Sequence, residues 1–425
     1  ELQVSAAEWS EHCSYKSSKR HLRMLPTTGS NVIVEKGYDS GVLDVGGGYV
    51  VTVHIESHNH PSAVEPFGGA ATGVGGVIRD ILSAGTRPIA LFDGLRFGDI
   101  ENDLQARWLF KNAVAGIADY GNCLGIPTIG GEVEFDTCYK NYALVDVASV
   151  GFGKKSKLIK NHANVGDFVL LIGGSTGRDG VGGSQFASDA LEGEDRSAVQ
   201  IPDPFIVKLI IEAILEARDE KCINAMKDLG GGGLSCAISE TAESLGVGIE
   251  LDVQKVHLRE ADLSPDEIMV SESQERMLII TSPKKLPKIK QICKKFRIQC
   301  SMIGIVKKDK IMHVKNGRKT LMARILLIRK AENAFTEAGR LADWKPGVYL
   351  NKVGKKQASQ LAEQLSGAHI KEVYSSPLAR ALQTAKPIAE TRKLRVRRCA
   401  GVSAPSSVAE VVCVASSASV RGAGS

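Results

Sequence analysis

The stretch Tyr49–Ser62, YVVTVHIESHNHPS, runs from an apolar, β-branched segment into a cluster of acidic, imidazole and amide side chains. Such an apolar run is typical of a strand buried on both faces, at an inner position of a sheet. If the two-residue period of a strand continues, Glu56, His58 and His60 point to the same side. Pro61 should then end the strand. The stretch therefore predicts an inner strand that carries one carboxylate and two imidazoles to a loop. A hydrogen-bonded turn with incidental histidines is the alternative.

Length and composition set the outer limits. A chain of 425 residues predicts two or three domains. It has no apolar run of about 18 residues, so we expect no membrane span. It begins at Glu1 with neither an initiator methionine nor a charged-then-apolar leader, so it shows no secretory signal, and a fragment of a longer protein is an open alternative. The nine scattered cysteines lack CxxC pairs and indicate a reduced, cytoplasmic protein. The net charge of +6 does not require nucleic acid but suits anionic nucleotides.

Strand and helix patterns alternate in two zones, 1–153 and 164–318, which predicts layered α/β and α+β domains. The expected strands are 49–55, 143–150, 168–172, 249–253 and 277–280, and the expected helices are near 105–124, 203–217 and 288–296. The character changes at about residue 321, and residues 397–425 have the composition of a disordered tail.

Two other patterns have ordinary interpretations. In the lysine-rich stretch 283–297, Ile289, Ile292 and Phe296 recur at helical spacing. The lysines are therefore better explained as the solvent-exposed face of an amphipathic helix than as a nucleic-acid site. The glycine-rich loop 173–184 follows a strand but lacks the spacing of a P-loop.

Three carboxylates suggest metal chemistry. Glu56, Asp80 and Asp228 each end an apolar segment or stand in a glycine turn, where a carboxylate can meet solvent. Such groups hold Mg²⁺ together with nucleotide phosphates. Their spacing alone does not establish that they converge.

Several segments together resemble one family. They are WSEHCSYK (9–16), ESHNHPS (56–62), GGAATGVGGVIRD (68–80), GGE (130–132), DLGGGGL (228–234) and SESQER (271–276). The first 318 residues closely resemble phosphoribosylformylglycinamidine synthase, in the synthetase subunit of its small, multi-subunit form. The resemblance implies the fold of aminoimidazole ribonucleotide synthetase, an α+β domain (1–153) followed by an α/β domain (164–318).

The resemblance also implies a reaction in purine biosynthesis, that of a carbon–nitrogen ligase with glutamine as the amido donor. ATP phosphorylates the amide oxygen of formylglycinamide ribonucleotide to an iminophosphate, and ammonia displaces the phosphate. The ammonia comes from a separate glutaminase subunit, with a small bridging subunit in the assembly. By resemblance, the proton acceptor is His58 and the second catalytic histidine is His12. The implied ATP contacts are Tyr15 and His54, the metal ligands are Glu56, Asp80 and Asp228, and the substrate-binding residues are Ser57, His58, Asn59, His60, Arg79, Gln200, Glu272, Ser273 and Gln274.

Two departures leave a second hypothesis open. His54 stands where the family commonly carries an ATP-contacting lysine, and imidazole is a shorter, only partly charged ligand. The family's subunit also continues into a second pair of domains, whereas this chain leaves the pattern after Arg318. A homodimer of these halves is one way to replace the missing partner. The alternative is a catalytically inactive ATP-binding or assembly module of the amidotransferase complex.

The last zone, 321–396, resembles part of a histidine phosphatase of the phosphoglycerate-mutase type. The resemblance lies in 322–333, MARILLIRKAEN, and in 374–385, YSSPLARALQTA. That family uses an Arg-His-Gly motif, but Arg329 is followed here by Lys330 and Ala331, and no histidine occurs after 396. A lysine amine is largely protonated at neutral pH and does not readily replace a nucleophilic imidazole. We therefore expect a partial α/β domain without turnover, in which Arg329 and Arg380 can still bind an anion. A function located in this segment is the third hypothesis.

Overall fold

The computed structural model describes residues 2–13, 24–34, 39–188, 198–320, 324–338, 345, 347–368, 370–398 and 409–415. The chain forms two compact units. One comprises residues 25–183 and 191–320, and the other comprises 1–24, 184–190 and 321–425. We call them the synthetase-like unit and the C-terminal unit.

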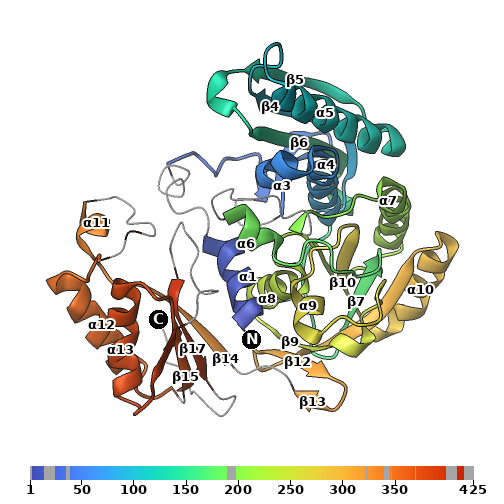
Figure 1. Cartoon of the computed structure of the whole chain (residues 1–425). Coiled ribbons are helices and arrows are strands. Elements are labelled where there is room, and N and C mark those ends of the chain that lie inside the picture. The colour runs from blue at the N-terminus through green and yellow to red at the C-terminus, as the bar shows by residue number, and fades with distance from the viewer. Residues whose placement is uncertain are drawn as a thin grey trace. The chain divides into compact units, whose positions relative to one another are not determined.

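The first sheet of the synthetase-like unit has six strands in the order β1-β2-β3-β6-β4-β5. Their bounds are β1 Val32–Val34, β2 Gly41–Gly46, β3 Tyr49–Ser57, β4 Arg87–Phe97, β5 Thr128–Phe135 and β6 Ala143–Lys154. β3 pairs antiparallel with β2 on one side and β6 on the other, so the predicted inner strand is confirmed. The helices of this part are α3 Asn59–Val64, α4 Pro66–Ser83 and α5 Leu104–Leu124, and α4 and α5 pack against each other (Figure 1).

Only one face of β3 is covered. Val50 and Thr52 are fully buried, whereas Tyr49, Val53 and Ile55 on the other face are 40%, 42% and 66% exposed. The expectation of burial on both faces was therefore wrong. The run is apolar on both faces of β3, but only one face packs on α4 and the other is exposed.

The second sheet has seven strands in the order β13-β12-β9-β11-β7-β10-β8. Its strands are β7 Phe168–Gly173, β8 Ala225–Asp228, β9 Gly248–Asp252, β10 Arg276–Thr281, β11 Gln299–Lys307, β12 Met312–Asn316 and β13 Lys319–Thr320. The helices are α7 Pro204–Asp219, α8 Gly233–Leu245, α9 Pro265–Val270 and α10 Leu286–Lys295. Asp203 caps α7 through the amide of Ile206. In α10, Ile289, Ile292 and Cys293 are buried, which confirms the predicted amphipathic helix.

Helix α4 corrects the expectation that Asp80 stands in a glycine turn. Residues 66–83 form one helix, nearly all of it buried, with five glycines inside it. Glycine costs about 1 kcal/mol relative to alanine inside a helix, so the local sequence argues against this element. The reason lies in close approach: a Cβ on Gly76 would stand 2.2 Å from a Glu56 carboxylate oxygen, and one on Gly75 would stand 2.5 Å from the Tyr120 hydroxyl.

The C-terminal unit contains a four-stranded sheet in the order β14-β17-β15-β16. Its elements are β14 Arg324–Arg329, α11 Ala334–Glu337, α12 Lys352–Gln364, β15 Ile370–Ser375, α13 Ala379–Glu390, β16 Val396–Arg398 and β17 Ala409–Ala415, and the unit also takes α1 Leu2–Cys13 and most of α6 Gly183–Ser188. Part of the predicted disordered tail thus forms a strand. Residues 409–415, AEVVCVA, pair with β14 and β15, because a β-branched apolar run can complete a sheet. Among the described residues, no helix combines the length and apolar character needed to cross a membrane.

Candidate functional site

The chain turns sharply where β3 meets α3. β3 ends at Ser57, and α3 begins at Asn59, so the expected continuation of the strand period to His60 was wrong. Pro61 lies in the first turn of α3, where its missing N–H is not needed by the helix. Ser57 donates a hydrogen bond to Asp146, and the Asn59 side-chain oxygen accepts one from the Val145 amide at 2.8 Å. Both bonds fix the corner to β6.

His58 lies at this corner, against helix α4. Its Nδ1 bonds to the carbonyl oxygen of Gly69, and a Cβ on Gly73 would stand 3.0 Å from the His58 Cβ. Because a carbonyl only accepts hydrogen bonds, Nδ1 carries the proton and Nε2 keeps a free lone pair. Burial lowers the pKa of His58 to about 4, and the charge of Arg79 adds to this effect. A neutral imidazole near pH 7 can accept a proton at Nε2.

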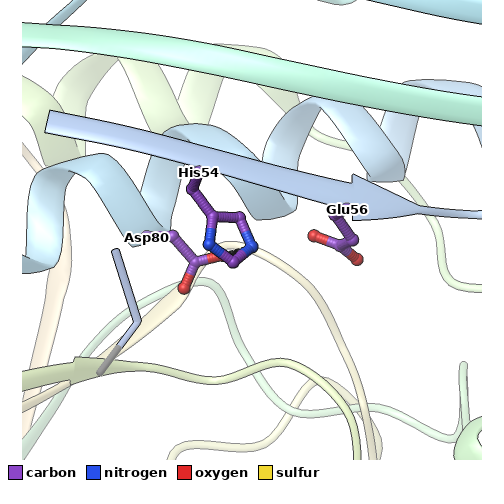
Figure 2. Close-up of side chains that lie close together, drawn as sticks. All are labelled: His54, Glu56 and Asp80. Carbon is purple, nitrogen blue, oxygen red and sulfur yellow. Dashed lines mark ion pairs between the residues drawn. The ribbon is translucent and has the colours of Figure 1, made fainter. Parts of the chain in front are cut away.

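The three predicted metal-binding carboxylates share one region. His54 and Glu56 extend from β3 toward Asp80 on α4, and His54 Nε2 lies 3.2 Å from Asp80 Oδ2 (Figure 2). The ligand atoms of His54, Glu56 and Asp80 lie within 4.8 Å of one another. Asp39, Asp80 and Asp228 form a second group within the same distance. Asp80 therefore links the two groups.

Asp39 also belongs to this region, although it was not among the predicted site residues. It stands just before β2, outside every motif, and no periodic or spacing signal marks it. Lys227, the residue before Asp228, bonds to Asp39 at 2.5 Å and to Glu240 at 2.6 Å. Only the fold brings Asp39 close to Asp80 and Asp228.

The site is electrostatically crowded. Burial, together with the charges of Asp228 and Asp39, raises the pKa of Asp80 well above its usual value. Burial and the charge of Asp39 raise the pKa of Asp228 to about 6. Burial also lowers the pKa of His54. A divalent cation would relieve the repulsion among these carboxylates, and oxygen ligands are those that Mg²⁺ prefers. The donor set fits Mg²⁺, with His54 the least suited of its members.

Arg79 connects this region with the segment that follows α9. The residue is 1% exposed, and its Nη1 donates to Glu275 Oε2 at 2.9 Å while Nη2 donates to Gln274 Oε1. Its Nε lies 3.8 Å from Asp228 Oδ2. Both terminal nitrogens thus already have protein partners. Substrate binding by Arg79 stays a prediction.

The expected substrate-binding residues of the second domain also meet. Gln200 Nε2 donates to Glu272 Oε2 at 2.8 Å, and the Gly232 amide donates to Glu272 Oε1 at 2.9 Å. The side-chain oxygen of Gln200 is buried without a hydrogen-bond partner among the described residues, so it can accept a bond from a ligand. Ser273 accepts a bond from the Gly177 amide at 2.9 Å, at the foot of the glycine-rich loop.

The remaining predicted residues lie elsewhere or outside the description. His60 Nδ1 lies 3.0 Å from the Tyr142 hydroxyl, and the two rings meet edge to face. His12 belongs to α1, but its side chain lies outside the described residues, as does Tyr15. Their assigned roles stay predictions.

Comparison with known families identifies the larger part of the chain. Residues 37–153 match the N-terminal domain of AIR synthase related proteins, and residues 164–315 match the C-terminal domain. The PurL subunit of phosphoribosylformylglycinamidine synthase from Methanobrevibacter smithii is 50% identical over 303 residues, which cover 70% of this chain and 42% of the relative. Residues 37–153 and 164–315 thus carry the two domains of AIR synthase related proteins, and this part of the chain is similar to PurL. The PurL subunit from Caldanaerobacter subterraneus is 49% identical over 323 residues, 75% of this chain and 44% of its own length. The chain thus spans less than half the length of these two PurL proteins.

Solved PurL structures agree with this family. Thermotoga maritima PurL complexed with FGAR has a TM-score of 0.69 and 28% identity, and the match covers 97% of this chain and 80% of that one. The same protein complexed with ATP, and the structure of PurLQS from this organism, each give a TM-score of 0.65. Residues 325–403 match the histidine phosphatase superfamily, branch 1. Both resemblances inferred from the sequence are therefore confirmed.

Proposed function

We propose that this chain carries out the synthetase reaction of phosphoribosylformylglycinamidine synthase, in the cytoplasm, on formylglycinamide ribonucleotide, ATP and glutamine-derived ammonia. The observation that carries the proposal is the convergence of Asp80 with Glu56 and with Asp228. These carboxylates come from α4, β3 and β8, which are far apart in the sequence. PurL relatives at about half identity, and the PurL complexes with ATP and with FGAR, support the same reaction.

The chemistry requires a proton acceptor and a fixed substrate. When ammonia attacks the iminophosphate, the nitrogen must lose protons, and His58 Nε2 is available for this because Nδ1 is already bonded. Ser57 and Asn59 flank His58, and Gln200, Glu272 and Gln274 offer amide and carboxylate groups to the ribonucleotide. Asn59 and Glu272 are held by backbone amides, which limits their motion.

Glu56, Asp80 and Asp228 would hold Mg²⁺, with Asp39 as a neighbour of the last two. When bound, Mg²⁺ neutralises charge on the nucleotide phosphates. His54, which lies beside Asp80, would offer the phosphates a short polar contact, at the position where the family commonly has a lysine.

We further propose that two copies associate through the exposed face of the six-stranded sheet. Tyr49 and Phe152 stack at 5.2 Å between ring centroids, both are 40% exposed, and Val53 and Ile55 continue the apolar face along β3. An exposed apolar face of this kind marks an interaction site. A glutaminase subunit and a small bridging subunit are the other proposed partners, in line with the PurLQS assembly of T. maritima. A strictly monomeric mass in solution, with and without MgATP, would contradict the self-association.

The deciding experiment measures phosphate release with ATP, Mg²⁺, the ribonucleotide and ammonium chloride, because ammonia bypasses the glutaminase. We expect release that depends on both the ribonucleotide and ammonium. Omitting the ribonucleotide provides the control for simple ATP hydrolysis. Binding of MgATP without ribonucleotide-dependent release would instead favour the inactive ATP-binding module.

A function in the C-terminal unit is the remaining candidate. Its family match supports a phosphatase fold, but Lys330 occupies the position of the nucleophilic histidine. We expect no hydrolysis of phosphomonoesters at acidic or neutral pH. Turnover that survives loss of His58 but not of Lys330 would place the function there.

A further inference from the structure

Glu275 is a buried carboxylate to which the proposed reaction gives no role. The residue is 2% exposed, and its side chain accepts three hydrogen bonds from three different elements. Arg79 Nη1 on α4 donates to Oε2 at 2.9 Å. The Tyr120 hydroxyl on α5 donates to Oε1 at 2.7 Å, and the backbone amide of Asp203, which caps α7, donates to the same oxygen at 3.0 Å. Three donors on one buried carboxylate are enough to define its position.

Two of these bonds, those from Arg79 and Tyr120, cross from one matched domain to the other. Arg79 and Tyr120 belong to the AIR-synthase N-terminal domain, whereas Glu275 and Asp203 belong to the C-terminal domain. The backbone of Glu275 has a φ of 62°, a left-handed conformation that is unfavourable for a residue with a long side chain. Its carbonyl accepts a bond from the Gly174 amide at 2.8 Å, which holds that conformation. The fold thus maintains a strained residue where it can reach the neighbouring domain.

The Glu275 carboxylate contacts the proposed site through Arg79. Arg79, whose Nη1 it binds, also contacts Gln274 through Nη2 and approaches Asp228 through Nε. Gln274 in turn donates to the Glu272 carbonyl at 3.1 Å. Arg79 Nε is buried and has no hydrogen-bond partner among the described residues. A shift of the Arg79 guanidinium would therefore change its contacts with Asp228, a proposed metal ligand, and with Gln274, a proposed substrate ligand.

We propose that Glu275, supported by Tyr120, is a positioning residue that fixes Arg79 and, through it, the ribonucleotide-binding groups against the metal site. Glu275 does not touch the reacting atoms. It sets the direction of the guanidinium and joins the two domains at that point. The inference deepens the proposed function and rests on it, but the position of Arg79 can be measured without any turnover.

The variants are Glu275→Gln and Tyr120→Phe in the full chain. Glu275→Gln removes the charge and places an amide where only acceptors fit, and Tyr120→Phe removes one donor without changing the charge. Glu212→Gln is the matched control, because Glu212 on α7 makes a bidentate pair with Arg87 on β4, at 2.8 Å for both bonds. That pair also crosses between the domains, but it is exposed, and neither of its residues belongs to the proposed site.

The first readout is the Nε–H signal of Arg79 in the chain labelled with ¹⁵N-arginine, assigned by its loss in Arg79→Lys. We expect Glu275→Gln to shift or broaden this signal strongly, Tyr120→Phe to shift it less, and Glu212→Gln to leave it unchanged. An Arg79 signal that is unaffected by both Glu275→Gln and Tyr120→Phe would overturn the inference, whatever the activity of the chain.

The second readout is the affinity for the ribonucleotide compared with that for MgADP, by titration calorimetry. Loss of a charge-assisted bond predicts a roughly tenfold weaker ribonucleotide affinity in Glu275→Gln, with MgADP affinity changed less than about twofold. Equal losses of both affinities would indicate a merely structural role and would overturn the inference. Absence of ribonucleotide binding by the unaltered chain would refute the proposed function instead, and the Arg79 signal would then decide the inference alone.

Discussion

Two arginines, Arg79 on α4 and Arg380 on α13, are both fully buried, yet their surroundings differ. Arg79 reaches Glu275, Gln274 and the neighbourhood of Asp228, all supplied by other parts of its unit. In the C-terminal unit, which contains Arg380, Lys330 is also buried. One turn after Arg380 on α13, the Thr384 hydroxyl accepts a hydrogen bond from the Ala331 amide. Both groups of side chains suited to a metal, among the described residues, lie in the synthetase-like unit.

A motif arginine is therefore informative about function only together with its partners. In the synthetase-like unit, carboxylates from distant elements complete the environment of Arg79. In the C-terminal unit, the family resemblance survives, but a buried lysine replaces the imidazole that the chemistry needs. If function belongs to the first environment and not to the second, variants in the two units should have different effects.

The largest expected effect is on catalysis. His58→Asn should lower ribonucleotide-dependent phosphate release by roughly 10²–10⁴-fold, because it removes the proposed proton acceptor. Lys330→Ala should leave the release unchanged. Both are measured in the ammonium-dependent assay, and an unchanged rate in His58→Asn would show that its assigned role is wrong.

The next effect is on stability. Arg79→Met should destabilise the synthetase-like unit by about 3–5 kcal/mol, because it leaves the Glu275 carboxylate buried without its cation. Arg380→Met should affect the unfolding of the C-terminal unit only. Scanning calorimetry with limited proteolysis separates the two. A common loss of stability in both units for either variant would contradict the comparison.

A smaller effect should follow from adding one methyl group to a helix. Gly76→Ala places a Cβ 2.2 Å from Glu56 Oε2, so we expect a cost of about 1–3 kcal/mol and weaker binding of Mn²⁺, a spectroscopic substitute for Mg²⁺. The matched variant is Gly354→Ala, whose Cβ would stand 2.0 Å from the Glu332 carbonyl oxygen in the C-terminal unit. It should disturb that unit without changing Mn²⁺ affinity, as read by electron paramagnetic resonance. Equal Mn²⁺ affinities in Gly76→Ala and the parent would argue against Glu56 as a ligand.

The smallest effect concerns Asp93 on β4, a carboxylate outside the metal-suited groups. Burial raises the pKa of Asp93 to about 6, although the Thr128 hydroxyl opposes this, and its Oδ1 has no partner in the described structure. The folded state therefore holds the proton more tightly than the unfolded state, and the parent protein loses stability as the pH rises from about 4 to about 6.

Asp93→Asn should remove this loss. The variant should be more stable than the parent by about 1 kcal/mol above pH 6 and equally stable near pH 4. The expected gain is small because Asp93 is partly exposed to solvent. Denaturant titrations at pH 4, 5, 6 and 7 measure the difference. A gain that is the same at every pH would point to packing and not to charge.

Several elements could be predicted from the sequence because their cause is local. The β-branched run at Tyr49 gave β3, the helical period gave α5, α7 and α10, and the motif segments identified the family and the candidate residues. These elements can be predicted because apolar residues recur with the period of a strand or of an amphipathic helix.

Other features depend on contacts between residues that are distant in the chain, so the sequence pattern does not reveal them. Helix α4 forms despite its five glycines because Glu56, His58 and Tyr120 approach it so closely that side chains there would collide. Asp39 joins the carboxylates, and Glu275 binds α4, α5 and the start of α7, through contacts between residues that are far apart in the chain. Propensity is a local quantity, whereas close approach and charge crowding depend on which distant atoms the fold brings together.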